Sequence, residues 1–538
     1  MGEPDELRQS EFKPSSGVNG PQRNVGTRTH ASEHGCPVEM DAGTASVSKM
    51  PTVVRCGRSI HFAPSGVDKV PVCLMHSRDM AKAIPELDKL FQREIDAILE
   101  SAGDGEADFT RFVFFSCNYS SRTFRAYCNF SRATFAQNAL FTLSRFKKGA
   151  SFDDATFSLG ASFAFTEFAH DAVFGGATFT KLADFGYTKF SRVADFSAVM
   201  FLDSVRFNRT EFLQDSEYLP GPIFTYARFS KPELSIFYKS DLSHAFFHRC
   251  DVTNINFSSV TWAERKGCRK RMVFEELVKF GDDDLVKIGH KMRLSTYDLE
   301  TDELSPDDRD YGLIAELYQQ LKKNYDERKD YWTAGDFHYG EMEMKRLATP
   351  RGRRLLAWLE GSRDRLAKRL NNGAKSPKWP AFWRFYSVVR KLNIIRRWWH
   401  QHLSLIAWYK YASEYGENYR RPVMWLVVVL ALFACLFPLK GVRYDPAKDL
   451  DAGKSASPQV LTYRQPAPAE KTWLIGWRAE TELLKDSCLS SLEVASFQKE
   501  RMYEPVYRTG HFLILMEMVM SSSLFALFLL AIRRQFRR

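Results

Sequence analysis

The sequence predicts a mixed β and α protein, in which a β-helix of stacked coils is followed by a helical linker and two transmembrane helices. Two observations support this fold class. Phenylalanine recurs at alternating intervals of five and six residues in the first half of the chain, and two long apolar segments lie near its end. Neither an α-helix nor an ordinary strand has the phenylalanine period, so a small unit must repeat and stack on itself.

The phenylalanine repeat continues over sixteen positions. Small residues, mostly alanine, stand two positions before many of these rings, and polar residues separate them, as expected of a filled interior and a solvated exterior. We expect about 22 residues in each coil, with the rings stacked along the axis at roughly the 4.8 Å strand spacing. The predicted core ladder is Phe130, Phe135, Phe141, Phe146, Phe152, Phe157, Phe163, Phe168, Phe174, Phe179, Phe185, Phe190, Phe196, Phe201, Phe207 and Phe212.

The repeat unit, as in GASFDDATFSLGASF (149–163), resembles the pentapeptide-repeat family in its Phe-rich form with an eleven-residue period. The resemblance implies a right-handed quadrilateral β-helix, with the phenylalanine and the small residue facing inward. Some members of that family mimic duplex DNA, which requires an acidic rod. Basic residues slightly outnumber acidic ones in 109–260, so we expect a scaffold or spacer instead.

Two apolar segments are predicted to span a membrane. Val423–Leu439 contains no charged residue, and Phe512–Ile532 contains only Glu517. At 1.5 Å per residue these helices are about 26 and 31 Å long, enough for a bilayer core. Arginines precede the first segment and follow the second, so the positive-inside rule predicts a multi-pass protein of the cytoplasmic (inner) membrane with both termini cytoplasmic. A buried hairpin in a soluble protein is the alternative.

The positive charge of the chain is concentrated beside the first apolar segment. The net charge is +11, and residues 345–421 hold 19 Lys or Arg against 4 Asp or Glu, so the rest of the chain is slightly acidic. Tryptophans interleave with these basic residues, a mixture typical of a helix at an anionic lipid surface. Nucleic acid is the weaker alternative, because a membrane span follows directly. The residues predicted to face lipid are Arg396, Arg397, Trp398, Trp399, Arg420 and Arg421.

Residues 309–347 predict a helical hairpin, with a turn near Ala334–Gly335. Its apolar stripe is Ile314, Leu317, Leu321 and Tyr325. The hairpin resembles the linker between the repeats and the membrane module of bacterial pentapeptide-repeat membrane proteins, and Tyr415-Gly416-Glu417 resembles their entry to the first span.

In many of those relatives the two spans are similar to a two-helix potassium-channel module. Residues 490–512 of this chain contain a single glycine, Gly510, and no filter of the T-x-G-Y-G type, so potassium selectivity is not expected.

The predicted organisation follows from these segments. It comprises a disordered tail (1–50), a strand-turn and capping helix (51–108), the β-helix (109–260), the helical linker (261–348), basic Trp-rich juxtamembrane helices (349–421), transmembrane helix 1 (422–439), an extracytoplasmic loop (440–511), transmembrane helix 2 (512–532) and a basic cytoplasmic tail (533–538).

Few residues indicate chemistry. We find no phosphate-binding loop, nucleophile elbow or catalytic triad spacing, and we expect neither enzyme activity nor a cofactor. Glu517 is the candidate functional residue inside a span, because intramembrane carboxylates are costly. Cys56, His61, Cys73 and His76 have a spacing that fits no common zinc motif, so a small strand-turn is the preferred interpretation and metal binding stays open.

The predicted function is a non-enzymatic scaffold or partner-binding protein at the cytoplasmic membrane. Its expected partners are a lipid bilayer with anionic lipids and an unidentified cytoplasmic protein, with no nucleic acid. The alternative is an oligomeric channel-like or membrane-permeabilising protein without a potassium filter. Small residues in the second span weakly favour a homo-oligomer.

Overall fold

A computed structural model provides the structure of the chain. It describes residues 35–41, 53–56, 58–62, 67–213, 221–277, 311–348, 398–440, 442–444, 459–461, 473–497 and 502–537, with five positions between 388 and 396. The chain divides into two compact units, Met1–Asp79 and Met80–Arg538. Most of the predicted disordered tail (1–50) and much of the basic juxtamembrane segment lie outside the described residues, but residues 35–41 of that tail are described and include the strand Glu39–Asp41.

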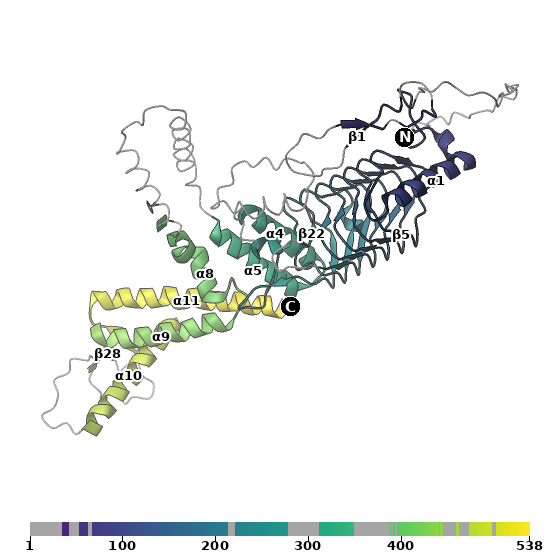
Figure 1. Ribbon diagram of the computed structural model, residues 1–538. Coiled ribbons are helices and arrows are strands. Elements are labelled where there is room, and N and C mark those ends of the chain that lie inside the picture. Colours follow the sequence, from purple (N-terminus) through teal and green to yellow (C-terminus); the bar gives the residue numbers. More distant parts are fainter. Residues whose placement is uncertain are drawn as a thin grey trace, which may run out of the picture. The chain divides into compact units, whose positions relative to one another are not determined.

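The second unit contains a β-solenoid of about 7 turns over residues 106–258, which confirms the predicted repeat fold. Four parallel sheets, of six, six, six and five strands, form its four sides (Figure 1). Each strand pairs with the strand of the next coil on the same side. Ala150 pairs with Ala172, and Phe157 with Phe179, so one coil takes the 22 residues that the spacing predicts.

Each strand of the solenoid belongs to one of these four sheets. The first sheet holds β3 (Glu106–Asp108), β6 (Tyr127–Asn129), β10 (Ala150–Ser151), β14 (Ala172–Val173), β18 (Ala194–Asp195) and β22 (Pro222–Ile223). The second holds β4 (Val113–Phe114), β7 (Thr134–Phe135), β11 (Thr156–Phe157), β15 (Thr178–Phe179), β19 (Met200–Phe201) and β23 (Arg228–Phe229). The third holds β8 (Ala139–Leu140), β12 (Ala161–Ser162), β16 (Ala183–Asp184), β20 (Val205–Asn208), β24 (Ile236–Tyr238) and β25 (Asn256–Ser258). The fourth holds β5 (Thr123–Phe124), β9 (Arg145–Phe146), β13 (Glu167–Phe168), β17 (Lys189–Phe190) and β21 (Glu211–Phe212).

The phenylalanine rings fill the interior in stacked columns. The ring centroids of Phe135 and Phe157 are 4.7 Å apart and those of Phe157 and Phe179 are 4.5 Å apart, with the planes of each pair within 2° of parallel. Rings of different columns meet edge to face, as Phe163 and Phe174 do at 82°. Both arrangements suit the aromatic quadrupole. The ladder is buried except at Phe212, which is half-buried because β21 is the last strand of its sheet.

The predicted break around 217–222 appears as a longer coil. Ala194 pairs with Pro222, 28 residues later, whereas the preceding coils take 22. Residues 214–220 lie outside the described part of the chain. The ladder resumes afterwards, because Phe201 stacks on Phe229 at 5.2 Å and Phe207 on Phe237 at 4.7 Å. The insertion therefore leaves the interior continuous.

Helix α1 (Pro85–Ala102) covers the N-terminal end of the solenoid, preceded by the short helix η1 (Met80–Ala83). The ring of Phe91 meets Phe114 edge-on at 5.4 Å. Lys82 Nζ donates to the carbonyl of Val113, and Gln92 donates to that of Ser116 at 3.1 Å. These bonds satisfy backbone groups that no further coil could reach.

Helix α4 (Tyr311–Glu327) covers the other end and pairs with α5 (Tyr331–Leu347) (Figure 1). The Asn324 side chain donates to the carbonyl of Val252 at 2.7 Å and accepts from the Asn254 amide at 2.8 Å. The predicted apolar stripe of the hairpin is buried. Between the solenoid and these helices lie β26 (Ala263–Glu264), β27 (Arg271–Met272) and α2 (Phe274–Leu277).

The predicted position of the hairpin turn is wrong. The turn lies at 328–330, and Ala334 and Gly335 are buried inside α5. The N-cap of α5 is Asp330, whose carboxylate accepts from the Thr333 amide at 3.1 Å. The Asp330 cap therefore fixes where α5 begins, and Gly335 is accommodated inside the helix.

Three helices follow at the C-terminal end of the chain. Helices α9 (Arg420–Lys440) and α11 (Arg508–Arg537) run side by side, and α10 (Trp473–Ala495) packs on both (Figure 1). The shorter α8 (Leu405–Ser413) precedes them. Strands β28 (Val442–Tyr444), β29 (Gln459–Leu461) and β30 (Tyr503–Pro505) form a small antiparallel sheet. Helix α10 lies within the segment 440–511 that the sequence analysis treats as a loop.

The first unit contains β1 (Glu39–Asp41) paired with β2 (Val53–Arg55) and an isolated bridge between Phe62 and Val72. A turn follows at 74–76. Outside β1 and β2, the described buried apolar side chains of this unit, apart from cysteines, are Val72, Leu74 and Met75.

We expect Phe174→Asp to abolish the β-sheet circular dichroism of the full chain. Phe174 is fully buried, with its ring centroid 5.0 Å from those of both Phe152 and Phe196, so the variant buries an unpaired carboxylate. Phe165→Asp is the matched control, because Phe165 is 52% exposed at a corner with φ +58°, a conformation that aspartate tolerates. Equal melting temperatures for the two variants would contradict the inward ladder.

Candidate functional site

The helical linker meets the C-terminal helices at a buried charged junction centred on Glu343 of α5. Its carboxylate accepts from Arg346 at 2.6 Å, Lys410 of α8 at 2.8 Å and the Tyr415 hydroxyl at 2.8 Å. Burial alone would raise the pKa of Glu343, but the hydrogen bonds from Arg346 and Lys410 outweigh it and lower the pKa to about 2. The carboxylate therefore stays ionised and ties α5 to α8.

The Tyr415-Gly416-Glu417 turn extends this junction to the end of α11. Arg534 donates to the carbonyl of Tyr415 at 2.5 Å and lies 3.3 Å from the Glu417 carboxylate. Gly416 has φ +79°, and a Cβ there would lie 2.6 Å from Leu530 of α11. Only glycine allows both this backbone conformation and this close approach. The motif noticed in the sequence is thus where the linker, α8 and α11 are joined.

Glu517 lies fully buried where the three C-terminal helices meet. The Ser491 hydroxyl of α10 contacts one oxygen of this carboxylate and also lies 3.0 Å from the Leu430 carbonyl of α9. The Ser521 hydroxyl donates to the backbone carbonyl of Glu517 at 2.7 Å. The predicted candidate residue therefore contacts a neighbouring helix instead of facing outward, and this contact fastens α10 to α11.

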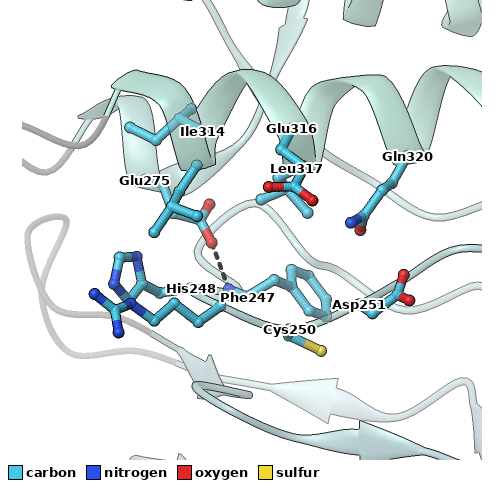
Figure 2. A pocket seen from close by; sticks show the side chains of 11 residues that line it. Phe247, His248, Cys250, Asp251, Glu275, Ile314, Glu316, Leu317 and Gln320 are labelled. Carbon is cyan, nitrogen blue, oxygen red and sulfur yellow. Dashed lines mark hydrogen bonds between the residues drawn. The ribbon is translucent and has the colours of Figure 1, made fainter.

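A cavity of about 300 Å³ lies between the last coils of the solenoid and α4 (Figure 2). Glu275 of α2 lines it and is 2% exposed. One oxygen of its carboxylate accepts from the Phe247 amide, and the other has no hydrogen-bond partner among the described residues. Burial raises the pKa of Glu275 to about 7, so this carboxyl group titrates near neutrality.

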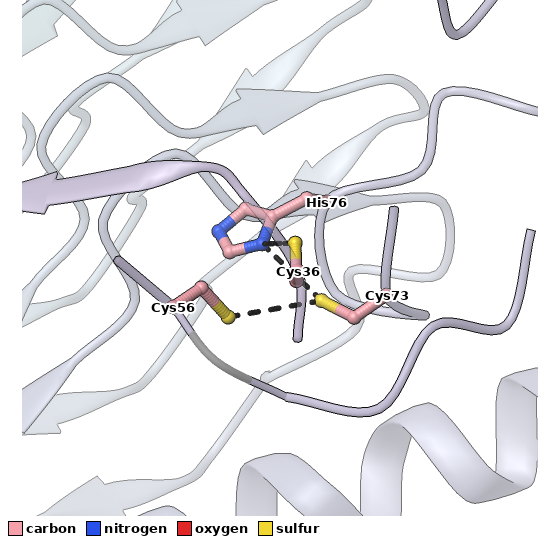
Figure 3. A group of neighbouring side chains, drawn as sticks. All are labelled: Cys36, Cys56, Cys73 and His76. Atoms are coloured by element: carbon pink, nitrogen blue, oxygen red, sulfur yellow. Dashed lines mark hydrogen bonds between the residues drawn. The ribbon is translucent and has the colours of Figure 1, made fainter. Parts of the chain in front are cut away.

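Four metal-ligand side chains converge in the first unit, and we name them the Cys/His cluster (Figure 3). Its ligand atoms all lie within 4.8 Å of one another. The cluster consists of Cys36, Cys56, Cys73 and His76. Three of these residues were singled out in the sequence. His61, the fourth residue of that set, lies outside the cluster with its ring Nδ1 3.0 Å from the Ser59 carbonyl, and Cys36 takes its place.

The local fold explains how the Cys/His cluster forms. The amide of Cys36 donates to the carbonyl of Arg58 at 2.9 Å and that of Cys56 to Val38 at 2.8 Å, so the β1–β2 pairing places two thiols together. The Phe62–Val72 bridge and the turn after it supply the other two ligands. Sequence reasoning missed Cys36 because its partner strand is more than ten residues away.

The thiols of the cluster are strongly coupled. The hydrogen bond with Cys73 lowers the pKa of Cys56 to about 3, and the same hydrogen bond, with burial, raises the pKa of Cys73 above its usual range. A bound metal ion would stabilise both as thiolates.

The structure describes five of the six residues that are predicted to face lipid. Arg396, Trp398 and Trp399 are exposed, and Arg397 lies outside the described residues. Arg420 is exposed, whereas Arg421 pairs with Glu414 at 2.5 Å. The set therefore includes one residue that makes an ion pair.

Comparison of the sequence with protein families found no matching family model, and comparison with curated proteins found no similar sequence. The repeat fold therefore rests on the regular phenylalanines and the solenoid that they form.

We expect Glu343→Gln to lower the stability of the helical region by about 3 kcal/mol, because it leaves the buried Arg346 and the half-buried Lys410 without their carboxylate. Thermal unfolding in detergent, followed by helical circular dichroism, measures this loss. Glu327→Gln is the control, since Glu327 forms an exposed pair with Lys323 at 3.8 Å and should change stability by less than about 0.5 kcal/mol. Equal losses of stability in the two variants would show that the Glu343 contacts stabilise the helices no more than an exposed ion pair does.

The depressed pKa of Glu343 also predicts a dependence on pH. Its stabilisation is fully present above the unfolded pKa, about 4.3, and is lost as the pH falls through about 2. Hydrogen exchange of α8 should therefore accelerate across this acid range in the parent chain. The Glu343→Gln variant should lack this component.

Glu275 predicts the opposite dependence, because its folded pKa is raised. The solenoid end should lose stability as the pH rises from about 4.3, the unfolded pKa, through about 7. Glu275→Gln keeps an acceptor for the Phe247 amide and should be more stable than the parent at pH 8 by up to about 3 kcal/mol, with no gain at pH 4. The control is Glu316→Gln, an exposed residue of the same cavity. A gain that does not vary with pH would contradict the assignment.

Proposed function

We propose that the protein is a non-enzymatic scaffold, anchored in the cytoplasmic membrane by α9 and α11, that presents its solenoid to a partner protein. One observation carries the proposal: these two helices are long and apolar enough to span a bilayer, yet only 33% and 17% of their most apolar windows are buried. The core helix of a soluble protein would be mostly covered. An exposed apolar area of this size favours lipid around it.

The exposed apolar side chains extend along both helices. On α9 they include Val423, Met424, Val427, Val428 and Leu432, and on α11 they include Phe512, Leu515, Val519, Phe525 and Leu529. Pairing of α9 with α11 leaves these faces uncovered, while Val429 and Phe433 pack in the interior between the helices. The buried-hairpin alternative from the sequence is therefore disfavoured.

The basic residues support an orientation. Arg420 begins α9, and Arg533 and Arg534 lie near the end of α11, on the same side as the Tyr415-Gly416-Glu417 turn that Arg534 contacts. The positive-inside rule then puts the linker and the solenoid in the cytoplasm. Exposed Trp398 and Trp399 suit contact with the headgroup region.

The scaffold role is supported by the form of the solenoid. The rings of the phenylalanine ladder are buried in the interior. A partner would therefore contact polar side chains and the few exposed aromatic residues at the corners, such as Phe165 and Tyr187. The hydrogen bonds of Glu343 and Arg534 connect the helices that cover the solenoid end with α8 and α11. A rod joined to its anchor in this way holds a partner at a defined place near the membrane.

Membrane anchoring is tested by fractionating cells that express the full chain. We expect the protein to stay in the membrane pellet after an alkaline wash and to be released by detergent. The double variant Val428→Arg and Leu432→Arg should move to the soluble or aggregated fraction, because charges in a lipid-facing position cost about 2.5–3.5 kcal/mol each. Leu143→Arg, at an exposed corner of the solenoid, should fractionate like the parent.

Release of the parent chain by the alkaline wash would contradict anchoring. Reconstitution in liposomes tests the channel-like alternative, and ion flux dependent on the protein would contradict a role restricted to scaffolding.

A further inference from the structure

We propose that the Cys/His cluster binds one Zn²⁺ ion, and that this ion holds the first unit in its folded form. The proposal concerns a part of the chain that the scaffold function does not use.

The distances within the Cys/His cluster match a tetrahedral zinc site. Zn–S bonds of about 2.3 Å and Zn–N bonds of about 2.0 Å place neighbouring ligand atoms of a tetrahedron about 3.5–3.8 Å apart. The Sγ atoms of Cys56 and Cys73 are 3.9 Å apart, and His76 Nδ1 lies 3.2 Å from Cys73 Sγ and 3.5 Å from Cys36 Sγ. Four side chains from three separate segments thus point to one centre (Figure 3).

The donor set selects the class of metal. Three thiols and one imidazole are soft ligands suited to Zn²⁺ and poorly suited to Mg²⁺ or Ca²⁺, which require oxygen. All four tetrahedral positions are supplied by protein, and three of the four side chains are buried. A closed site of this kind leaves no position for water or substrate, so the ion is structural.

The described part of this unit has a small apolar core. Outside β1 and β2, its described buried apolar side chains, apart from the cysteines, are Val72, Leu74 and Met75. Units of this size normally depend on a disulfide or a metal. Binding of zinc would join β1, β2 and the turn at 74–76 at a single point.

Neighbouring groups hold the ligands in position. Arg58 Nη1 lies 3.8 Å from Cys56 Sγ, where its charge favours the thiolate. Asp68 accepts from the Ser77 hydroxyl at 2.7 Å and from the Arg78 amide at 3.1 Å, which secures the chain just after His76. Such outer contacts orient metal ligands.

The test measures the metal content of the full chain by elemental mass spectrometry. The chain is purified in detergent under reducing conditions. We expect about one zinc per chain. Cys73→Ala and His76→Ala should lose it. His61→Ala and Cys268→Ala should retain it, because His61 lies outside the cluster and Cys268 is an exposed thiol elsewhere.

A second measurement keeps the proposal testable if ligand variants fail to fold. Cobalt added to the chelated parent chain should give thiolate-to-metal charge-transfer and tetrahedral ligand-field bands, and zinc should displace it. Chelation should open residues 36–79 to proteolysis while the solenoid over 106–258 stays resistant. The proposal would be overturned if the reduced parent chain contained no zinc and gave no cobalt absorption bands. A disulfide between Cys56 and Cys73 in the native protein would also overturn it.

Discussion

The stacking of phenylalanine rings between coils is the interaction on which the rest of the second unit depends. In the regular coils a ring lies about one strand spacing from the ring 22 residues before it, as Phe163 does from Phe141 at 5.1 Å and 4°. Aromatic pairs contribute about 0.5–1.5 kcal/mol beyond the area they bury. This ladder sets the register, because a shift of one residue would turn every ring outward.

A ladder of this kind ends with unpaired backbone, and both ends are closed by helices in similar ways. At the first coil Lys82 and Gln92 reach carbonyl groups, and at the last coil Asn324 performs the same task for Val252. The C-terminal closure has a second consequence. Because α4 pairs with α5, the helix that covers the solenoid also carries Glu343, and through it the contacts that reach α8 and α11.

The two units are stabilised by different interactions. The solenoid repeats one apolar unit until the interior is large, and this interior stabilises the coils. The first unit shows few buried apolar side chains outside β1 and β2, and in our proposal a zinc ion at the Cys/His cluster links its segments. The chain thus contains a fold held by stacked rings and, in our proposal, a fold held by zinc.

The sequence by itself determined the repeat, its 22-residue coil, the inward ladder and the two apolar helices, because each depends on local periodicity or composition. It also located three of the four cluster residues and the buried stripe of α4. Only the tertiary structure decided the identity of the fourth ligand, Cys36, the burial of Glu275 and Glu517, and the junction between Glu343 and Tyr415. These contacts join residues 20 to 120 positions apart. No short-range pattern encodes which of many polar side chains meet once the chain has folded.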